Sequence, residues 1–504
     1  MRKAAVLLPL SSLPSPWGAG DLGIEARQFV QSLARSGVGG WQVLPLTELS
    51  PVFGYSPYSP LSAFAGDVLY VSPEMLAKEG WIKESDLPKR LPTGPANFGQ
   101  ARRIRLDLIR LVWERHRNNQ EFSGFRDRND HWLREYCLFK ILKNRHGDLP
   151  WNLWPEPYRL RDEGALDVLE AEAHNEIDQL AFGQFLFFRQ EQRLRQLCTE
   201  KGVDFLGDLP IYVTHDSPDV WGHPELFQLG DDLQPTSIAG VPPDYYSVDG
   251  QTWGNPLYRW ENHEATDFNW WMSRLTHSLN LYDRVRLDHF RGLLSYWAIP
   301  SNATSAREGR WQDAPSQAFF QALRQKFPSM PFLAEDLGII TPDVQKAMKD
   351  TGISGMAVLQ FAFDSDVGQS PYAPHNLSPS ITVYTGTHDN DTIKGWYQTA
   401  PDKTKENLRT YTGTDVEDCS ASWTLIRLAL GSVADMAVIP AQDLMDLGSD
   451  ARINRPSTIE GNWTWRLSQE GVPQETFQRL ERLLKIYGRS LDEKRSCNEE
   501  IQKG

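Results

Sequence analysis

The chain has no apolar run close to the roughly 18–20 residues that a membrane-spanning helix needs, although 40% of its 504 residues are hydrophobic. Its opening, MRKAAVLLPLSSLPSPWG, has a basic start and a short apolar patch, but prolines interrupt the patch and no small-residue cleavage site follows. We therefore expect neither a membrane anchor nor a secretory leader. The composition, with 23% charged residues, is typical of a globular protein, and we expect it in the cytoplasm.

Cysteine is scarce. The four cysteines lie far apart, with no CxxC pair and no histidine at metal-ligand spacing: Cys137, Cys198, Cys419 and Cys497. This spacing argues against a disulfide framework and against a zinc site. We expect ordinary thiols in a reducing compartment.

Positive charge is also in short supply, because 52 Lys and Arg residues face 66 Asp and Glu residues, a formal net charge of −14. Such a chain repels a phosphate backbone, and it has no long Lys/Arg block, so we expect no nucleic-acid partner. A neutral or small ligand is favoured. The 18 Trp, 16 Tyr and 22 Phe residues suit stacking on sugar rings, but they suit a large apolar core equally well.

What the chain does contain is a series of short, nearly continuous apolar runs with helix-like stretches between them. Runs of this kind are typical of parallel strands buried on both faces. The alternation predicts an α/β protein built on a (β/α)₈ barrel, without a C-terminal β-sandwich domain. The eight runs are WQVLPL (41–46), DVLYVSP (67–73), VDFLGDLP (203–210), DRVRLD (283–288), PFLAED (331–336), MAVLQFAF (356–363), ITVYTGTHD (381–389) and MAVIPAQD (436–443).

Two segments interrupt the alternation. Residues 76–185 are charged and rich in helix formers, which predicts a helical insertion after the second strand. Residues 212–275 are rich in Pro, Gly, Asp and aromatic residues, which predicts an irregular insertion that forms part of the ligand groove. We therefore divide the chain into barrel (1–75), helical insertion (76–185), barrel (186–211), irregular insertion (212–275) and the remainder of the barrel (276–504).

Acidic residues end several of the predicted strands. Asp208, Asp288 and Glu335 each close one run, and Asp389 follows His388 at the end of another. In a (β/α)₈ barrel the active site forms at the carboxyl ends of the strands. A single acidic strand end is about twice as often a salt-bridged or capping carboxylate as a catalytic one, but four on one rim favour chemistry.

Two chemistries use such a cluster. Glycoside cleavage needs two carboxyl groups that flank the bond, roughly 5 Å apart in retaining enzymes. Metal-assisted hydrolysis would instead use His289, His388, Asp288 and Asp389 as ligands. No HxH or HExxH spacing is present, and Arg286 would oppose a cation. Arg286 shares a strand face with Asp288 and is expected to keep that carboxylate ionised, so glycoside chemistry is favoured.

Several segments resemble one family of enzymes. RVRLDHFRGLLSYWAIP, FLAEDLGIITPDV and YTGTHDNDT are similar to the catalytic segments of 4-α-glucanotransferases, known as amylomaltases or disproportionating enzymes, in glycoside hydrolase family 77 of the α-amylase superfamily. The similarity continues along the chain in SSLPSPWGAGDLG, SPYSPLSAFAG, GDLPIYV, AGVPPDYYS, GQTWGNPLYRW and ARINRPSTIEGNWTWR.

The resemblance implies roles for individual residues. Asp288 would be the nucleophile, Glu335 the general acid and base, and Asp389 the carboxylate that stabilises the transition state. Residues that would bind or border the glucan are Ser56, Tyr58, Asp208, Tyr245, Tyr246, Gln251, Trp253, Arg286, His289 and His388.

The implied activity is transfer of α-1,4-glucan segments to the 4-hydroxyl of an acceptor, with malto-oligosaccharides or amylose as donors and glucose as an acceptor. No metal or organic cofactor is implied, and we expect a monomer or weak homodimer. Three alternatives remain: a hydrolase of the same superfamily, a barrel metalloenzyme, and a glucan-binding protein without activity.

Overall fold

The computed structural model describes residues 2–243, 248–338, 341–364, 366–458 and 460–491. Eight parallel strands form its centre, and each pairs with the next around the ring. A bridge between Leu333 and Ser354 joins the last strand of this order to the first, so the sheet closes into a barrel. In that order the strands are β10 (Gly355–Val358), β11 (Ile381–Tyr384), β12 (Met436–Pro440), β1 (Lys3–Leu7), β2 (Gly40–Gln42), β3 (Asp204–Leu209), β6 (Arg284–Leu287) and β9 (Phe332–Ala334).

The predicted (β/α)₈ barrel is confirmed, and seven of the eight apolar runs overlap one of its strands. The prediction for residues 67–73 was wrong. The carboxylate of Asp67 accepts a hydrogen bond from the amide of Leu69 (2.8 Å) and so starts a 3-10 helix over Val68–Tyr70. The eighth strand is β1, at the start of the chain. The sequence pattern does not predict it, because prolines follow soon after its apolar run.

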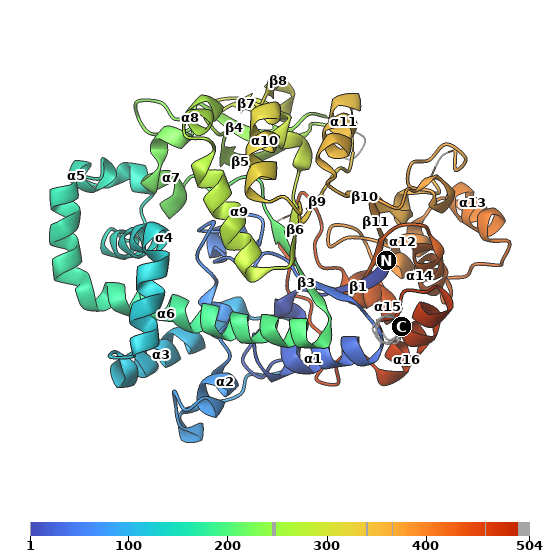
Figure 1. The fold of residues 1–504 in the computed structure, drawn as a ribbon, viewed down its shortest axis with the longest axis horizontal. Helices are drawn as coiled ribbons and strands as arrows, with labels where there is room; N and C mark the ends of the chain where they lie inside the picture. The colour runs from blue at the N-terminus through green and yellow to red at the C-terminus, as the bar shows by residue number, and fades with distance from the viewer. Residues whose placement is uncertain (1, 244–247, 339–340, 365, 459, 492–504) are drawn as a thin grey trace, which may run out of the picture.

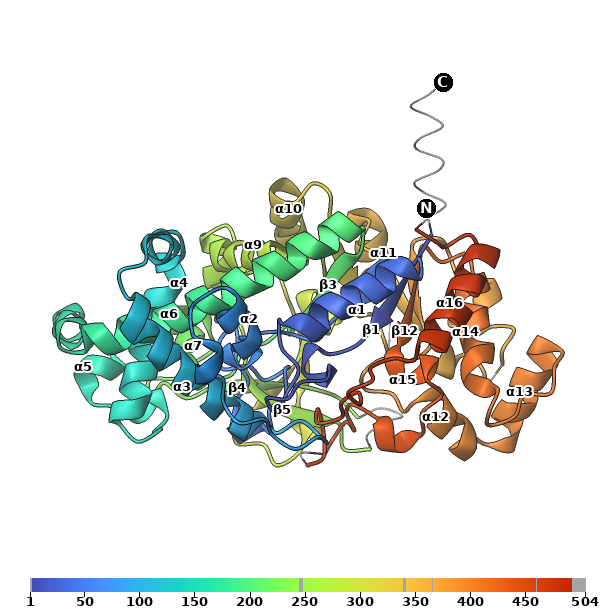
Figure 2. The ribbon, with the colours of Figure 1, turned by 90° about the horizontal axis from the view of Figure 1, so that it is seen from below.

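Helices of the predicted insertion project from one side of the barrel (Figure 1). The predicted boundary at 185/186 falls inside α6, a helix of 39 residues whose C-terminal part leads into β3 and contacts α1, beside which it lies in Figure 2. The helices up to this point are α1 (Ile24–Arg35), α2 (Pro73–Lys78), α3 (Phe98–His116), α4 (Gln120–Arg145), α5 (Glu156–Arg159) and α6 (Glu163–Lys201).

A four-stranded antiparallel sheet lies between barrel strands in the sequence, in the order β5-β4-β7-β8. Two of its strands fall within residues 212–275, so that segment has more regular structure than its composition predicts. The strands are β4 (Ser237–Val241), β5 (Gln251–Pro256), β7 (Ser295–Pro300) and β8 (Arg310–Asp313), and the nearby helices are α7 (Pro218–Gly222), α8 (Trp260–Ala265), α9 (Asn269–Leu281), α10 (Ser316–Lys326) and α11 (Pro342–Thr351).

Helices and loops follow the last barrel strand, and the part of the chain described here has no β-sandwich after β12. Every residue of β10 and β12 is buried, as continuous apolar strands between helices and barrel interior should be. The remaining helices lie on the opposite side of the barrel from the insertion (Figure 1): α12 (Ile393–Thr399), α13 (Asp402–Thr412), α14 (Ala421–Gly431), α15 (Ala441–Leu444) and α16 (Gln474–Ile486).

Candidate active site

The acidic strand ends meet at the carboxyl end of the barrel. Asp208 lies in β3 opposite Arg286 of β6, and Leu287 of β6 lies opposite Ala334 of β9. Asp288 and Glu335 are the next residues of their strands, so the register places them side by side. The local packing requires a small residue before Asp208, because a Cβ at Gly207 would lie 2.1 Å from the Tyr282 ring.

Arg286 joins two of these carboxylates. Its guanidinium donates to both oxygens of Asp208 (2.8 and 2.9 Å) and to Asp288 (3.1 Å). The Arg286 side chain is 5% exposed and that of Asp208 is fully buried, whereas 26% of the Asp288 side chain is open. Burial alone would lower the pKa of Arg286, but Asp208 and Asp288 raise it well above its usual value. Arg286 therefore stays charged.

Asp288 and Glu335 are neighbouring carboxyl groups whose pKa values are both raised. Burial raises the pKa of Asp288 to about 7; Arg286 opposes this shift, and the nearby Asp208 and Glu335 add to it. Burial also raises the pKa of Glu335, against the charge of Arg286 and the amide of His289, which donates to Glu335 Oε2 (2.8 Å). Two such carboxyl groups that hold a single proton supply one carboxylate and one carboxylic acid, the combination that retaining glycoside cleavage requires.

His289 adopts left-handed backbone geometry with φ of 46°, which turns the chain directly after Asp288. Its ring meets the Trp253 ring edge-on, with 4.9 Å between centroids, and Trp253 Nε1 donates to Gln251 Oε1 (3.1 Å). Burial, with a smaller effect of Arg291, lowers the pKa of His289 to about 4, so its imidazole is neutral at neutral pH. Its Nε2 has no hydrogen-bond partner in the described part of the chain.

Asp389 is held as a carboxylate. Its Oδ1 accepts from Asn454 (2.6 Å), and its Oδ2 lies 3.3 Å from Nε2 of His388. Burial would raise the pKa of Asp389, but the charge and hydrogen bond of His388, together with the bond from Asn454, hold it well below its usual range. Because 46% of this side chain is exposed, a ligand can reach the carboxylate.

Tyr58 connects Asp208 with His388, the neighbour of Asp389. Its hydroxyl donates to Asp208 (2.7 Å) and lies 3.3 Å from Nδ1 of His388. The Tyr58 ring stacks on the His388 ring with centroids 4.8 Å apart. Ser56 stabilises the loop that carries Tyr58, because its hydroxyl accepts a hydrogen bond from the Tyr58 amide (3.3 Å). The other two predicted groove residues, Tyr245 and Tyr246, lie outside the described residues.

Asn454 and Trp463 belong to this site although the sequence alone does not single them out. Both follow β12, within ARINRPSTIEGNWTWR. The Trp463 ring lies 5.9 Å from that of Tyr58 and 6.0 Å from that of His388. The nearest sequence signal was the resemblance of that segment to the family, which carries no role for either residue.

Replacing Asn454 with alanine is expected to lower kcat about 10- to 100-fold, because a hydrogen bond to a charged group contributes about 1.5–3 kcal/mol. The substitution leaves Asp389 free to turn away from the substrate. Steady-state kinetics on maltotriose measure this loss. Asn376→Ala, which removes an exposed side-chain amide at the end of a short 3-10 helix, is the matched control and should keep normal turnover; equal activities of the two variants would contradict the role given to Asn454.

Neither metal ligands nor a membrane span is evident in the regions described. His, Cys, Asp and Glu side chains there form no group of three that could hold a metal ion. No helix among the same residues is long and apolar enough to cross a bilayer.

Comparison with known proteins identifies relatives along nearly the whole chain. The model of the 4-alpha-glucanotransferase family, glycoside hydrolase family 77, matches residues 8–471. A 4-alpha-glucanotransferase of Aquifex aeolicus is 41% identical over 491 residues, covering 97% of this chain and 100% of the relative. One from Thermus thermophilus is 42% identical, covering 95% and 97%.

Among solved structures, an amylomaltase from Streptococcus agalactiae in complex with acarbose superposes with a TM-score of 0.93 at 32% identity. The superposition covers 97% of this chain and 100% of that one. The sequence relatives and this solved structure each match at least 95% of the chain. The chain belongs to the 4-alpha-glucanotransferase family, the disproportionating enzymes that transfer segments of α-1,4-glucans.

Proposed function

We propose that Asp288 is the nucleophile, Glu335 the general acid and base, and Asp389 the carboxylate that stabilises the transition state in this transfer. The observation that carries the assignment is the different environment of the three groups. Asp288 is bonded to the Arg286 guanidinium, which favours its ionised form. Glu335 instead accepts a hydrogen bond from the backbone amide of His289 (2.8 Å), and we assign the proton of the pair to Glu335, the general acid.

The reaction then has two displacements. Asp288 attacks the anomeric carbon of the donor while Glu335 gives its proton to the departing 4-oxygen, so one glycosidic bond breaks and a glucosyl-enzyme ester forms. In the second step the Glu335 carboxylate takes the proton of the acceptor 4-hydroxyl, whose oxygen displaces Asp288. The enzyme returns to its starting state, and one α-1,4 linkage has replaced another.

The remaining predicted residues would bind and cover the sugar. Asp208, Tyr58 and His388 form one connected group, with Ser56 in the loop that carries Tyr58. His289, Trp253 and Gln251 form a second group. Arg286 holds the nucleophile. Tyr245 and Tyr246, in the segment between β4 and β5, would cover the intermediate and exclude water. The assignment uses no metal or organic cofactor.

The proposal includes the working partners of the enzyme. Malto-oligosaccharides and amylose are the donors, and glucose or another glucan is the acceptor. We place the protein in the cytoplasm as a monomer or weak homodimer. The net charge of −14 supports the absence of a nucleic-acid partner.

Incubation of the purified protein with maltotriose and EDTA tests the reaction. We expect glucose together with a ladder of longer maltodextrins at constant total reducing ends, because each transfer breaks and makes one linkage. Thin-layer chromatography and a reducing-end assay measure both quantities. Rising reducing ends without longer products would identify a hydrolase, and loss of activity with EDTA would identify a metalloenzyme.

Replacing Arg286 with glutamine is expected to move both limbs of the pH profile of kcat/KM to higher pH, by about 1–3 units. The Arg286 charge lowers the pKa of both Asp288 and Glu335, so its removal raises both. Initial rates on maltotriose across the pH range measure the shift. Arg145→Gln, which removes a surface ion pair with Glu172, should leave the profile in place; an unmoved profile in Arg286→Gln would contradict the tuning role.

A further inference from the structure

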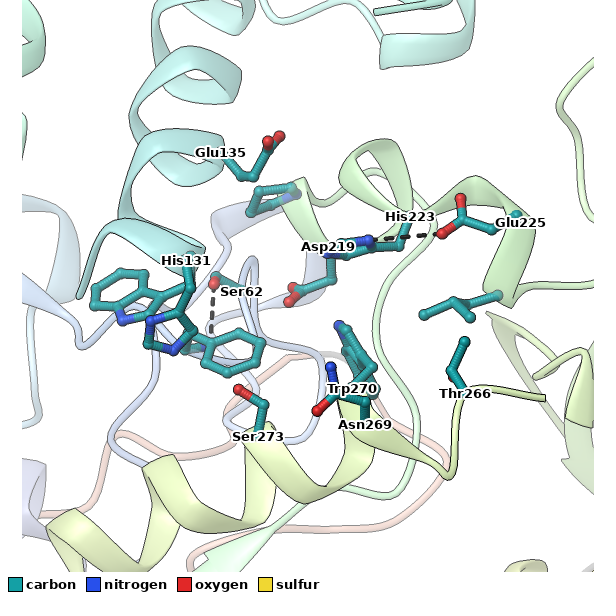
Figure 3. A pocket seen from close by; sticks show the side chains of 14 residues that line it. Ser62, His131, Glu135, Asp219, His223, Glu225, Thr266, Asn269, Trp270 and Ser273 are labelled. Atoms are coloured by element: carbon teal, nitrogen blue, oxygen red, sulfur yellow. Dashed lines mark hydrogen bonds and ion pairs between the residues drawn. The ribbon is translucent and has the colours of Figure 1, made fainter. Parts of the chain in front are cut away.

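A cavity of about 270 Å³ lies outside the catalytic cleft, between α4, α7 and α9, and none of the proposed site residues lines it (Figure 3). Its volume is near the lower end of the roughly 300–1,000 Å³ that small-molecule pockets occupy. Phe64, on the loop that follows β2, forms part of its wall. The transfer mechanism does not use this cavity.

Flat aromatic rings form much of the wall. The Phe64 and Trp132 rings are nearly parallel, with an interplanar angle of 13° and 6.3 Å between centroids. The Trp270 ring stands almost perpendicular to Phe64, at 83° and 6.2 Å. Rings of this kind offer apolar faces against which the C–H face of a pyranose can pack.

Polar groups point into the same space. Figure 3 shows the Trp270 nitrogen, the Asp219 carboxyl group and the Asn269 amide directed toward the cavity, with the Ser273 hydroxyl at its edge. Trp270 is only 8% exposed, yet its Nε1 has no hydrogen-bond partner among the described residues. One oxygen of Asp219 accepts from the amide of Ala63 (2.8 Å). The cavity thus presents a buried donor and a buried acceptor beside the aromatic rings.

The charges around the cavity narrow the choice of ligand. Glu135 is bound to Arg161, and Glu225 lies 3.7 Å from His223, so these acids are already matched. The Asp219 carboxylate would repel an anion; burial raises its pKa to about 6, and the amide of Ala63 with the charges of Arg274 and His223 oppose that shift. A cation or a hydrocarbon would leave the Trp270 N–H without an acceptor, which is costly in a buried position. A neutral, flat ligand rich in hydroxyl groups matches both the polar groups and the rings.

We propose that this cavity is a second sugar site, which binds one pyranose unit as free glucose or as the end residue of a malto-oligosaccharide. The choice of sugar rests on the proposed substrates of the enzyme. Two hydrogen bonds hold the loop after Tyr58. Asp219 accepts from the amide of Ala63 (2.8 Å), and the hydroxyl of Thr214 donates to the carbonyl of Pro60 (3.0 Å). A sugar bound there stabilises the loop that carries Tyr58 into the catalytic cleft.

Fluorine NMR of the protein labelled with 5-fluorotryptophan tests the proposal. The Asp288→Asn variant is used so that sugars are not converted, and the resonances of Trp270 and Trp253 are assigned by their substitution with phenylalanine. Trp253 reports the catalytic cleft and Trp270 the cavity. We expect glucose or maltotriose to shift the Trp270 resonance along a saturating curve with its own midpoint. A response to both sugars indicates a site for one free unit, and a response to maltotriose alone indicates a site for a chain end.

Ser273→Phe fills the cavity from α9 and is expected to abolish the Trp270 response while the Trp253 response remains. Ser273→Ala keeps the space and should keep both responses. A silent Trp270 would overturn the proposal, as would a Trp270 curve that follows Trp253 and survives Ser273→Phe. Equal shifts with open-chain mannitol or with tetramethylammonium would also overturn it. Failure of the proposed function is a separate result, namely no disproportionation of maltotriose by the unaltered enzyme.

Discussion

Replacing Asp288 with asparagine is expected to lower the rate of maltotriose disproportionation about 10⁴-fold or more, the scale on which removal of a catalytic nucleophile acts. The amide has the size of the carboxylate but cannot form the glucosyl ester. Since 26% of the Asp288 side chain is open to the cleft and its partner Arg286 keeps Asp208, the fold should survive. Initial rates and a thermal unfolding curve measure the two effects separately.

Asp350→Asn provides the matched control, because it makes the same chemical change on an exposed helix. That variant should keep normal turnover. Retention of more than a small fraction of activity in Asp288→Asn, with the cleft intact, would contradict the nucleophile assignment.

Glu335→Gln is expected to slow transfer from maltotriose about 10²- to 10⁴-fold, the usual contribution of a general acid and base. With α-maltosyl fluoride as donor, the first step should stay close to normal, because fluoride leaves without a proton. Fluoride should therefore appear as a burst. Slow turnover should follow, because the variant has no carboxylate to take the proton of the acceptor hydroxyl in the second step. The alkaline limb of the pH profile, which reports loss of the Glu335 proton, should disappear.

Rapid-quench measurement of fluoride release gives the burst, and Glu406→Gln, a change on an exposed helix, should behave like the unaltered enzyme. An equal loss with maltotriose and with the fluoride would show that Glu335 does not protonate the leaving group.

The sequence predicts the barrel well because parallel strands buried on both faces need unbroken apolar runs. The same signal is ambiguous at residues 67–73, where the run is buried but the Asp67 side chain closes a turn. It also misses β1, whose five residues end two positions before Pro9. Burial alone therefore does not separate a strand from a buried turn.

The strand pattern correctly predicts that the acidic strand ends lie together at one end of the barrel. Asp208, Asp288 and Glu335 meet because the strand register requires it. Asn454 and Trp463 approach Asp389 and Tyr58 from a loop after β12, and no local pattern predicts where such a loop folds back. The cavity beside Trp270 has the same origin, since its walls come from segments far apart in the sequence.

The most direct measurement is capture of the glucosyl-enzyme. Glu335→Gln is mixed with α-maltosyl fluoride, quenched in acid, digested and analysed by mass spectrometry. The double-displacement account predicts a maltosyl adduct on the peptide that contains Asp288, located on that residue by fragmentation. An adduct on Asp389 or Asp208, or a fluoride burst with no adduct anywhere, would contradict it.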